Sequence, residues 1–519
     1  MPAITITPRR SMVFSAFRAI AVIIGSYVFV VLLAAACVYL PYLALVNLEY
    51  LQFQLLVLFL AGVVIACTML WSILPRRVKF EPPGVLLERS AQPRLFAELD
   101  NIAASLNEPT PQEVYLMAQV NAFVADRGGI LGFRSRRIMS IGLPLFSILT
   151  VSEFRGILAH EFAHYYSGDT GLGPLVYKAQ SAMIRNLQNI DSLQKIGRIG
   201  AAQILYLIVN FILTHQLTLF LRVINFISRE KEHRADELAC LIAGVNPFLQ
   251  ALRKIHGAEV AWFGYWQSEV APVLERGFIP VVTEGFAQFV ATPEVADLIT
   301  KVIESELEKT KADPLSSHPP LRDRIAAIEQ LTSSSVAEDS AMALALLDHP
   351  ESAESDLVAF LRGKKESLRR IGWDELARIA MIPSWKSFVT ENAALLQGVS
   401  VETIPELIQK LPEIGSRMRD PQGRLLTPNE RTGRAAKLLA TALSLTLLEK
   451  GWELEHQPGV FYFHRGEEKT NTFSTVHELI EGKLSREAWF AHCDKLGISG
   501  SPLWTETAAA PDSAHAALK

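Results

Sequence analysis

Two long apolar segments near the start of the chain limit its possible folds more than any other feature. Residues 17–41 read FRAIAVIIGSYVFVVLLAAACVYLP, and residues 53–74 read FQLLVLFLAGVVIACTMLWSIL. Each reaches the roughly 20 apolar residues with which a helix crosses the hydrocarbon core of a bilayer. The length of the first run and the presence of the second argue against a cleaved signal ending near Cys37. The sequence therefore predicts a two-helix transmembrane hairpin within a membrane anchor of residues 1–80.

Positive charges flank this hairpin on both sides. The flanking cations are Arg9, Arg10 and Arg18 before the first span and Arg76, Arg77 and Lys79 after the second. The loop between the spans has no Lys or Arg. Because Lys and Arg collect on the cytoplasmic side of membrane proteins, we expect both ends of the hairpin, and the catalytic region that follows, on the cytoplasmic face of the cell (inner) membrane.

The composition fits a membrane protein with a large soluble part. Of the 519 residues, 50% are hydrophobic and 20% are charged, and the net charge of -4 gives no indication of nucleic-acid binding. The four cysteines lie far apart in the sequence, which predicts neither a disulfide framework nor a paired-cysteine metal site. These cysteines are Cys37, Cys67, Cys240 and Cys493. A reducing compartment is expected.

A soluble pattern begins at residue 81 and predicts one folded domain up to residue 331. An amphipathic helix is expected over residues 93–106, followed by short strands within residues 113–126 and 136–146, with a turn at Gly128 and Gly129. Thr150 and Glu153 have the spacing of a capping box, so a helix should begin there.

A polar, serine-rich linker over residues 332–345 is predicted to separate this domain from a C-terminal α+β region over residues 346–504. The elements expected there are helices over residues 341–361, 430–450 and 485–496 and a hairpin that turns at Pro458 and Gly459. Residues 505–519 are expected to form a disordered tail. The role of this region is open.

The segment LAHEFAHYYSGD, residues 158–169, contains two histidines four positions apart. On an α-helix these positions share a face, so His160 and His164 can present their imidazoles to one metal ion. Glu161 projects about 100° further round the helix, where it can act as a base on water without binding the metal. The alternative is a surface helix turn rich in histidine. The apolar neighbours favour a buried helix, in which these polar groups need a partner such as zinc.

Catalytic zinc usually takes three protein ligands and keeps a fourth position open. The segment ISREKEHRADELAC, residues 227–240, places Glu232 and Asp236 on one helical face. Glu232 is expected to be the third ligand, and Asp236 to fix a histidine ring through its free N–H. His233 competes as a ligand but points away from the face of Asp236. An ordinary salt-bridged face with Arg229 or Lys231 is the other alternative.

The string H-E-x-x-H-x-x-x-G-D at residues 160–169, followed by S-R-x-x-E-x-x-A-D at residues 228–236, resembles metallopeptidase family 48. That family contains the HtpX-type membrane proteases and the CAAX prenyl endopeptidases. Two further matches occur in the same order, NAF at residues 121–123 and HPPLRDRI at residues 318–325. The four elements together cover about residues 93–331.

The resemblance implies a fold class and a set of site residues. The fold is mainly α with a small β-sheet, a zincin-like α+β protease domain between the membrane hairpin and the C-terminal region. One zinc ion per chain would be bound, with Glu161 as the catalytic base. The implied zinc ligands are His160, His164 and Glu232. The implied substrate-binding residues are Asn121, Ala122 and Phe123, on an edge strand that pairs with an extended peptide. His318 matches a histidine that contacts the substrate or the developing oxyanion; a turn without a catalytic part is the alternative.

A third apolar run, residues 203–227, is long enough to span a membrane but is interrupted by polar residues. One crossing would place His164 and Glu232 on opposite sides of the membrane, so the implied ligand set requires two crossings or none. Residues 172–200 carry five charged side chains, too many for a second span. No crossing is therefore expected, with the run packed on the protease core or dipping into one leaflet, which departs from the four-span HtpX pattern.

Together these features predict a membrane-anchored zinc-dependent endopeptidase. Its expected partners are protein or peptide substrates and the lipid bilayer, and its expected role is membrane protein quality control or the processing of a defined substrate. The alternative is a membrane-tethered binding or scaffold protein with a structural or inactive zinc site. Structural zinc normally has four protein ligands, and the glutamate beside His160 with no cysteine nearby argues against that reading. The oligomeric state is open.

Overall fold

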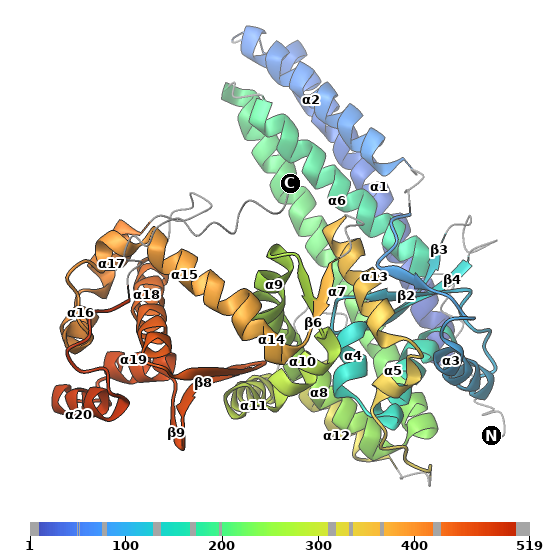
Figure 1. Ribbon diagram of the computed structural model, residues 1–519. Helices are drawn as coiled ribbons and strands as arrows, with labels where there is room; N and C mark the ends of the chain where they lie inside the picture. Colours follow the sequence, from blue (N-terminus) through green and yellow to red (C-terminus); the bar gives the residue numbers. More distant parts are fainter. Residues whose placement is uncertain are drawn as a thin grey trace, which may run out of the picture. The chain divides into compact units, whose positions relative to one another are not determined.

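The computed structural model describes most of the chain and is mainly helical with small sheets (Figure 1). The described residues are 10–48, 50, 52–74, 80–127, 136–166, 173–196, 200–309, 318–331, 336–363, 368–418 and 427–504. The predicted turn at Gly128 and Gly129, the first part of the predicted linker and the predicted tail lie outside them. The chain packs as two compact units, the first made of residues 1–259 and 298–365 and the second of residues 260–297 and 366–519. The domain limits expected from the sequence stay predictions.

The predicted membrane hairpin is confirmed as a pair of packed apolar helices, α1 (Arg10–Asn47) and α2 (Gln52–Ile73). The two backbones come very close at Gly62, where an added Cβ would lie 1.9 Å from the carbonyl oxygen of Cys37. Any larger residue would clash at this distance, so only glycine fits there. Glycine is one of the small residues that let membrane helices approach closely. Among the described residues, three helices are long and apolar enough to cross a membrane: α1, α2 and α7 (Gly200–Ala243).

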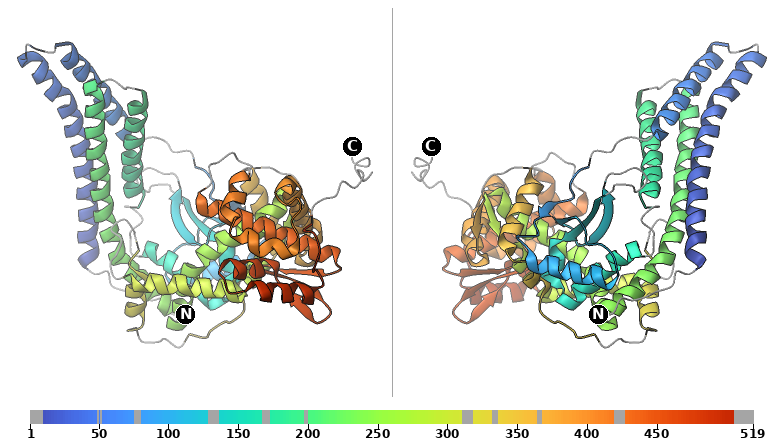
Figure 2. Two further views of the ribbon diagram at one scale, coloured as in Figure 1. Left: turned by 90° about the vertical axis from the view of Figure 1, so that its left-hand side faces the viewer. Right: turned by 90° about the vertical axis from the view of Figure 1, so that its right-hand side faces the viewer.

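Helix α7 and the preceding α6 (Gly173–Ile196) lie along this hairpin (Figure 2). The buried side chains of α7 that pack with α1 and α2 are Ala202, Tyr206, Val209 and Leu213. Residues 203–227 therefore pack on the membrane hairpin in their first part, and the expectation of a place on the protease core is wrong there. Whether they cross the bilayer stays a prediction.

Polar residues of α6 and α7 have partners inside the helix bundle, which explains why they do not prevent this packing. Asn189 donates to the hydroxyl of Ser72 at 2.8 Å, and Arg185 donates to the Ser72 carbonyl at 3.3 Å. Gln216 donates to the carbonyl of Ser26 at 3.0 Å. These partners belong to α1 and α2, so the sequence of α6 and α7 alone does not reveal them.

A four-stranded sheet forms the β part of the first unit. Its strands are β1 (Val85–Leu87), β2 (Glu113–Met117), β3 (Ala122–Arg127) and β4 (Arg136–Gly142). Their order is β1-β2-β4-β3, with β2 and β4 parallel and the other neighbours antiparallel, so β3 is an edge strand. The second half of the predicted run 136–146 is helical instead: α4 (Leu143–Ile148) begins with Pro144 in its first turn, where proline favours a helix start.

Helix α5 (Val151–Tyr166) runs through the core of the first unit and packs against α7 and α3 (Pro93–Ser105). The predicted capping box is present. The Thr150 N–H donates to Glu153 Oε2 at 2.8 Å, and the Glu153 N–H donates to Thr150 Oγ1 at 3.3 Å. Each bond provides an acceptor for a backbone N–H group at the helix start, which fixes where α5 begins.

The segment after residue 336 packs on the start of α5. The N–H of Val151 donates to the carbonyl of Ala341, and the N–H of Ser152 donates to the carbonyl of Asp339. The segment continues into η3 (Ala343–Leu346) and α13 (Pro350–Arg362), and α13 contacts β1 and β2. Residues 339–343 therefore complete the first turn of α5, and the helix expected over residues 341–361 begins at Pro350. Other helices along this part of the chain are α8 (Val245–Tyr265), α11 (Pro293–Glu308) and α12 (Leu321–Ile328).

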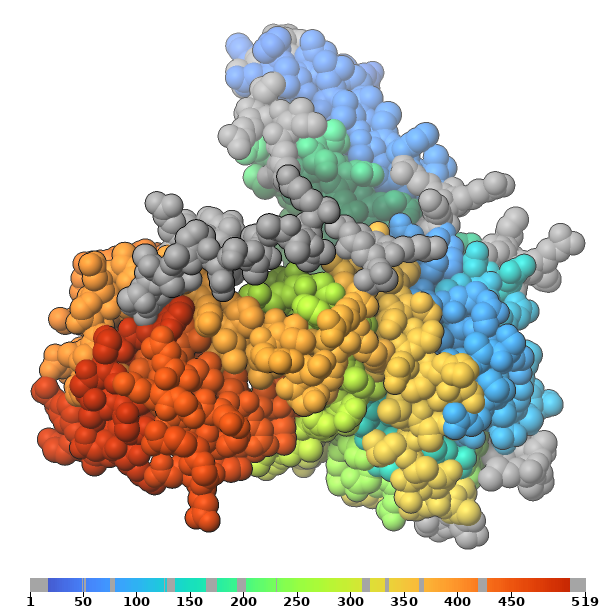
Figure 3. Space-filling model, viewed as in Figure 1, coloured from blue at the N-terminus to red at the C-terminus, as the bar shows by residue number. Residues whose placement is uncertain are grey.

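The second unit combines helices with two small sheets, one of them the predicted C-terminal hairpin. β7 (Glu453–Gln457), β8 (Val460–Arg465) and β9 (Glu468–Thr470) form an antiparallel sheet, and Gly459 turns between β7 and β8 with φ 86°. β5 (Phe278–Pro280) pairs in parallel with β6 (Arg369–Ile371). Residues 260–297 thus fold with the C-terminal region although they precede α12 in the chain. The atoms of residues 368–418 and 427–504, orange to red in Figure 3, form one continuous surface.

The helices that follow residue 381 surround a core centred on α18 (Pro428–Glu449), which confirms the helix expected over residues 430–450. The other helices of the second unit are η2 (Trp266–Val270), α9 (Ala271–Glu275), α10 (Val282–Ala291), α14 (Trp373–Leu376), η4 (Ala377–Met381), α15 (Ile382–Glu391), η5 (Ala393–Leu395), η6 (Val401–Thr403), α16 (Ile404–Ile408), α17 (Leu411–Arg417), α19 (Thr472–Ile480) and α20 (Arg486–Leu496).

Candidate metal centre

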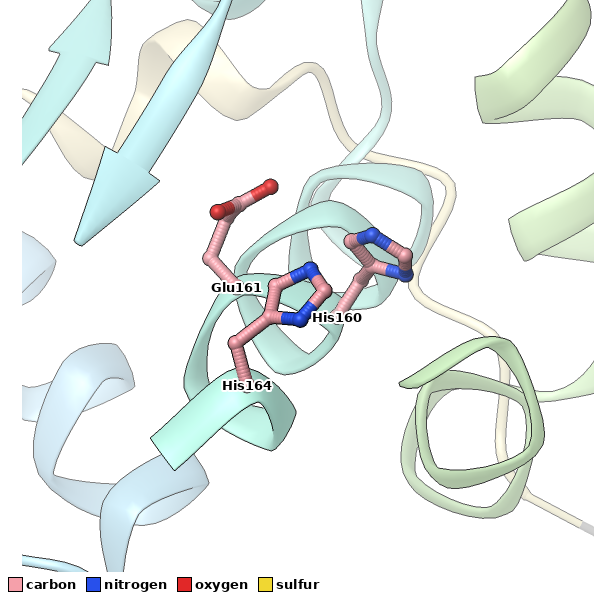
Figure 4. A group of neighbouring side chains, drawn as sticks. All are labelled: His160, Glu161 and His164. Atoms are coloured by element: carbon pink, nitrogen blue, oxygen red, sulfur yellow. The ribbon is translucent and has the colours of Figure 1, made fainter. Parts of the chain in front are cut away.

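Helix α5 holds two imidazoles and one carboxylate in a small space. The nearest possible ligand atoms of His160, Glu161 and His164 all lie within 4.8 Å of one another. The rings of His160 and His164 meet edge to face with centroids 4.9 Å apart, and the Glu161 side chain leaves the helix in another direction (Figure 4). Leu158, Ala159 and Phe162 are fully buried and fix this helix in the core. The spacing on the helix thus brings the imidazoles together as the sequence predicts.

Helix α7 brings a carboxylate to both imidazoles. Glu232 Oε2 lies 3.5 Å from His160 Nε2, and Glu232 Oε1 lies 3.5 Å from His164 Nε2. In a tetrahedral zinc site with bonds of about 2.1 Å, two ligand atoms are about 3.4 Å apart. The N–O separations therefore fit a zinc ion between the two histidines and Glu232, with an imidazole and carboxylate donor set that zinc commonly uses.

The ring of His160 is held from two sides. Its Nδ1 lies 3.0 Å from Asp236 Oδ1, and Phe248 stacks on the ring with a centroid distance of 5.9 Å and an interplanar angle of 26°. The Nδ1 contact leaves Nε2 directed at Glu232. Asp236 thus contacts the ring nitrogen of His160 that faces away from Glu232. Asp236 contacts His160 at 3.0 Å and Arg324 at 2.6 Å.

The segment before and within α12 contributes two more groups. His318 Nδ1 lies 2.7 Å from Glu232 Oε2, and its side chain is 56% exposed. Arg324 is buried and binds Asp236 with two hydrogen bonds, from Nε to Oδ2 at 2.9 Å and from Nη2 to Oδ1 at 2.6 Å. Its Nη1 lies 4.0 Å from Glu232 Oε2.

Sequence reasoning missed Arg324, although a signal for it exists. Leu321, Ile325 and Ile328 form the buried stripe of α12, and Arg324 occupies a position of the same stripe. An arginine on the apolar face of a helix needs a buried acidic partner, because an unpaired buried charge is costly. The position of Arg324 on this stripe therefore predicts that the arginine is paired with a buried carboxylate.

Burial and neighbouring charges shift the pKa values of these groups. Burial raises the pKa of the Glu161 carboxyl to about 7, and burial together with the nearby His160 lowers the pKa of His164 to about 4. Burial also acts to lower the pKa of His160, but Asp236 and Glu232 outweigh it and raise that pKa to about 9. Burial would raise the pKa of Glu232, yet hydrogen bonding to His160 keeps it below its ordinary range. Without a metal, His160 thus carries a positive charge between two carboxylates.

The charges of the site also match a divalent cation. The carboxylates of Glu232 and Asp236 are buried with one guanidinium, that of Arg324, and Glu161 lies beside them. With neutral imidazoles, the two buried carboxylates exceed the guanidinium by one negative charge, and an ionised Glu161 adds a second. A divalent ion between His160, His164 and Glu232 would neutralise them, which is the usual way in which buried charges are tolerated.

The predicted substrate strand lies at the sheet edge. Ala122 and Phe123 begin β3, and Asn121 precedes it and accepts a hydrogen bond from the Gly142 N–H at 2.9 Å. β3 also packs against α5, the helix of the two imidazoles. One edge of β3 has no strand partner among the described residues.

Comparison with known proteins agrees with this arrangement. Residues 89–332 match Peptidase family M48. Protease HtpX of Xylella fastidiosa (strain 9a5c) is 27% identical over 148 residues, which are 27% of this chain and 50% of that protein. Protease HtpX of Shewanella denitrificans is 23% identical over 44% of this chain and 69% of that protein, and the HtpX homolog of Aquifex aeolicus is 29% identical over 31% and 55%. In the first of these matches, the chain spans about half the length of the curated relative.

Proposed function

Residues 89–332 belong to peptidase family M48, and from this premise we propose that the protein is a membrane-anchored zinc endopeptidase that hydrolyses peptide bonds of protein substrates. The observation that carries the proposal is the approach of Glu232 to within 3.5 Å of both His160 Nε2 and His164 Nε2. These three residues would hold the zinc ion. Zinc bound there would supply a Lewis acid that polarises the scissile carbonyl.

Glu161 is the proposed catalytic base. Its carboxylate lies beside the two imidazoles without taking the position of Glu232, so it can accept a proton from the attacking water and return it to the leaving amine. Asp236 orients His160 and stays out of the reaction. His318 is partly exposed beside Glu232, where its ring can donate a hydrogen bond to the substrate or to the developing oxyanion.

The free edge of β3, with Asn121, Ala122 and Phe123 at its start, is the proposed substrate site. An extended peptide would pair with this edge through main-chain hydrogen bonds, which require little from the substrate's side chains. Such recognition suits a protease of unfolded segments. We place the catalytic unit on the cytoplasmic face of the membrane, in membrane protein quality control or processing.

Replacing Glu161 with Gln tests the function. We expect the full-length Glu161→Gln protein, purified in detergent, to bind one zinc ion per chain and to cleave casein at least 100-fold more slowly than the wild type, because only proton transfer is lost. Zinc content is measured by metal analysis, and a chelator should abolish the wild-type activity until zinc is restored.

The matched control is Glu338→Gln, which changes an exposed glutamate of the same unit and should leave cleavage unchanged. Undiminished cleavage by Glu161→Gln would overturn the assignment of the base. A wild-type protein that binds zinc but cleaves no substrate would instead support the scaffold alternative.

A further inference from the structure

We propose that Arg324 is a positioning residue of the metal site, which fixes the Asp236 carboxylate and, through it, the ring of His160. This inference rests on the proposed function, since it assumes that His160 binds zinc. Arg324 lies on α12, a different element from both α5 and α7. It therefore connects a third helix to the two that carry the ligands.

The contact between Arg324 and Asp236 prevents rotation of the carboxylate. Two N–H groups of the guanidinium reach the two different oxygens of Asp236, at 2.9 and 2.6 Å. Both side chains are buried, with exposed fractions of 5% and 2%. A bidentate pair of this kind fixes the plane of the carboxylate as well as its place.

One oxygen of Asp236 serves both neighbours. Oδ1 accepts from Arg324 Nη2 and lies 3.0 Å from His160 Nδ1. Because this oxygen cannot move without breaking the bidentate pair, a fixed carboxylate oxygen lies 3.0 Å from the Nδ1 atom of His160. The other ring nitrogen, Nε2, then stays directed at Glu232 Oε2.

The shape of the guanidinium matters here as well as its charge. A lysine ammonium would supply a point charge near Asp236 and Glu232 but would not bind both oxygens of Asp236 in one plane. If Arg324 acts by position, Lys does not restore the site. If it acts by charge alone, Lys does.

Zinc affinity is the test, measured on the full-length protein by competition with a chelator. We expect Arg324→Gln, Arg324→Lys and Asp236→Asn each to weaken zinc binding 10- to 100-fold, the effect typical of groups that orient a metal ligand. The control is Arg322→Gln, an exposed arginine two residues before Arg324 on the same helix, which should stay within twofold of the wild type.

A double-variant cycle tests whether Arg324 acts through Asp236. We expect Asp236→Asn with Arg324→Gln to bind zinc no more weakly than the weaker single variant, because both changes break the same relay. This pair also removes both buried charges, so it keeps the test open if Arg324→Gln alone fails to fold. The absorption spectrum of the cobalt-loaded protein should change in the single variants and not in Arg322→Gln.

Wild-type zinc affinity in Arg324→Lys, or effects that simply add in the double variant, would overturn the positioning role. Failure of the wild-type protein to bind zinc would be a different result, since it contradicts the proposed function itself.

Discussion

At the residue scale, the first turn of α5 illustrates how the helix of the two imidazoles is held. Three successive backbone N–H groups at its start have acceptors, from the carbonyls of Ala341 and Asp339 and from the hydroxyl of Thr150. A helix leaves its first four N–H groups without partners inside the helix, so such acceptors decide where it begins. Here two of them come from residues nearly 190 positions later in the chain.

We expect Thr150→Ala to lower the free energy of unfolding by about 1 kcal/mol, because it removes the acceptor of the Glu153 N–H. Thermal unfolding of the detergent-purified protein measures the effect. Thr432→Ala is the control, since that hydroxyl only bonds a carbonyl of its own helix. An unchanged midpoint in Thr150→Ala would show that residues 339–343 alone hold the helix start.

Residue patterns predicted some parts of this site and not others. The spacing of His160, His164 and Glu161 indicated a metal-binding helix, and Thr150 with Glu153 indicated its start. Arg324 was missed, because a buried ion pair needs two partners 88 positions apart and a single sequence does not show that they meet. The acceptors Ala341 and Asp339 were missed for the same reason, since backbone carbonyls leave no trace in a sequence pattern.

At the scale of elements, the α1–α2 hairpin depends on one close contact between backbones. An added Cβ at Gly62 would lie 1.9 Å from an oxygen of the α1 backbone, whereas one at Gly25 would meet nothing within 4 Å. Helices in a membrane associate through tight packing, because the surrounding lipid is as apolar as their side chains.

We therefore expect Gly62→Val to destabilise the hairpin by about 1 to 3 kcal/mol, the usual range for an overpacked site. The thermal midpoint and the yield of folded protein should both fall. Gly25→Val adds the same side chain to the exposed face of α1 and should change neither. Equal effects of the two substitutions would contradict the importance of the contact.

The length and hydropathy of α1 and α2 were enough to predict the hairpin, since a bilayer sets both. The place of α7 was not predictable in this way. Its polar residue Gln216 argued against a lipid-exposed span, and its partner, the carbonyl of Ser26, belongs to α1, so the sequence of α7 alone does not reveal it. Strand β4 was predicted too long, since proline in the next turn starts a helix instead.

At the scale of the whole molecule, the family-matched region does not coincide with one packing unit. Residues 260–297 lie inside residues 89–332 and yet pack with the C-terminal region. The hydroxyl of Tyr265 donates to the Val282 carbonyl, Trp373 Nε1 donates to the Val281 carbonyl, and Gly285 leaves no room for a Cβ against the Trp373 ring. The contacts of Trp373 join segments about 90 positions apart, so a single sequence does not reveal them.

This division predicts how shortened chains behave. A chain that ends at residue 331 should lose zinc binding, because it lacks the acceptors at the start of α5 and the buried Leu357 and Val358 of α13. A chain that ends at residue 363, with residues 266–292 replaced by a short Gly-Ser linker, should keep it. The two shortened chains are compared by their zinc content and by their size-exclusion profiles.

Residues 266–292, which the linker replaces in that second chain, are called the inserted segment. The chain with the linker is the matched control for a chain that keeps this segment. The same chain with residues 266–292 left in place should aggregate, because buried side chains such as Ile279 and Phe286 lose their cover. A soluble, monodisperse protein of this type would show that the inserted segment does not depend on the C-terminal region.

The continuous helix α7 fixes the distance between the membrane hairpin and the metal centre. The helix runs without interruption from Gln216, which contacts α1 in the bundle, to Glu232 at the metal centre. At a rise of 1.5 Å per residue these 16 positions amount to about 24 Å. An extended peptide advances about 3.3 Å per residue, so about seven residues cover that length. If the protein acts as the proposed protease, a substrate anchored at the level of Gln216 would need about that many residues before a bond could reach Glu232.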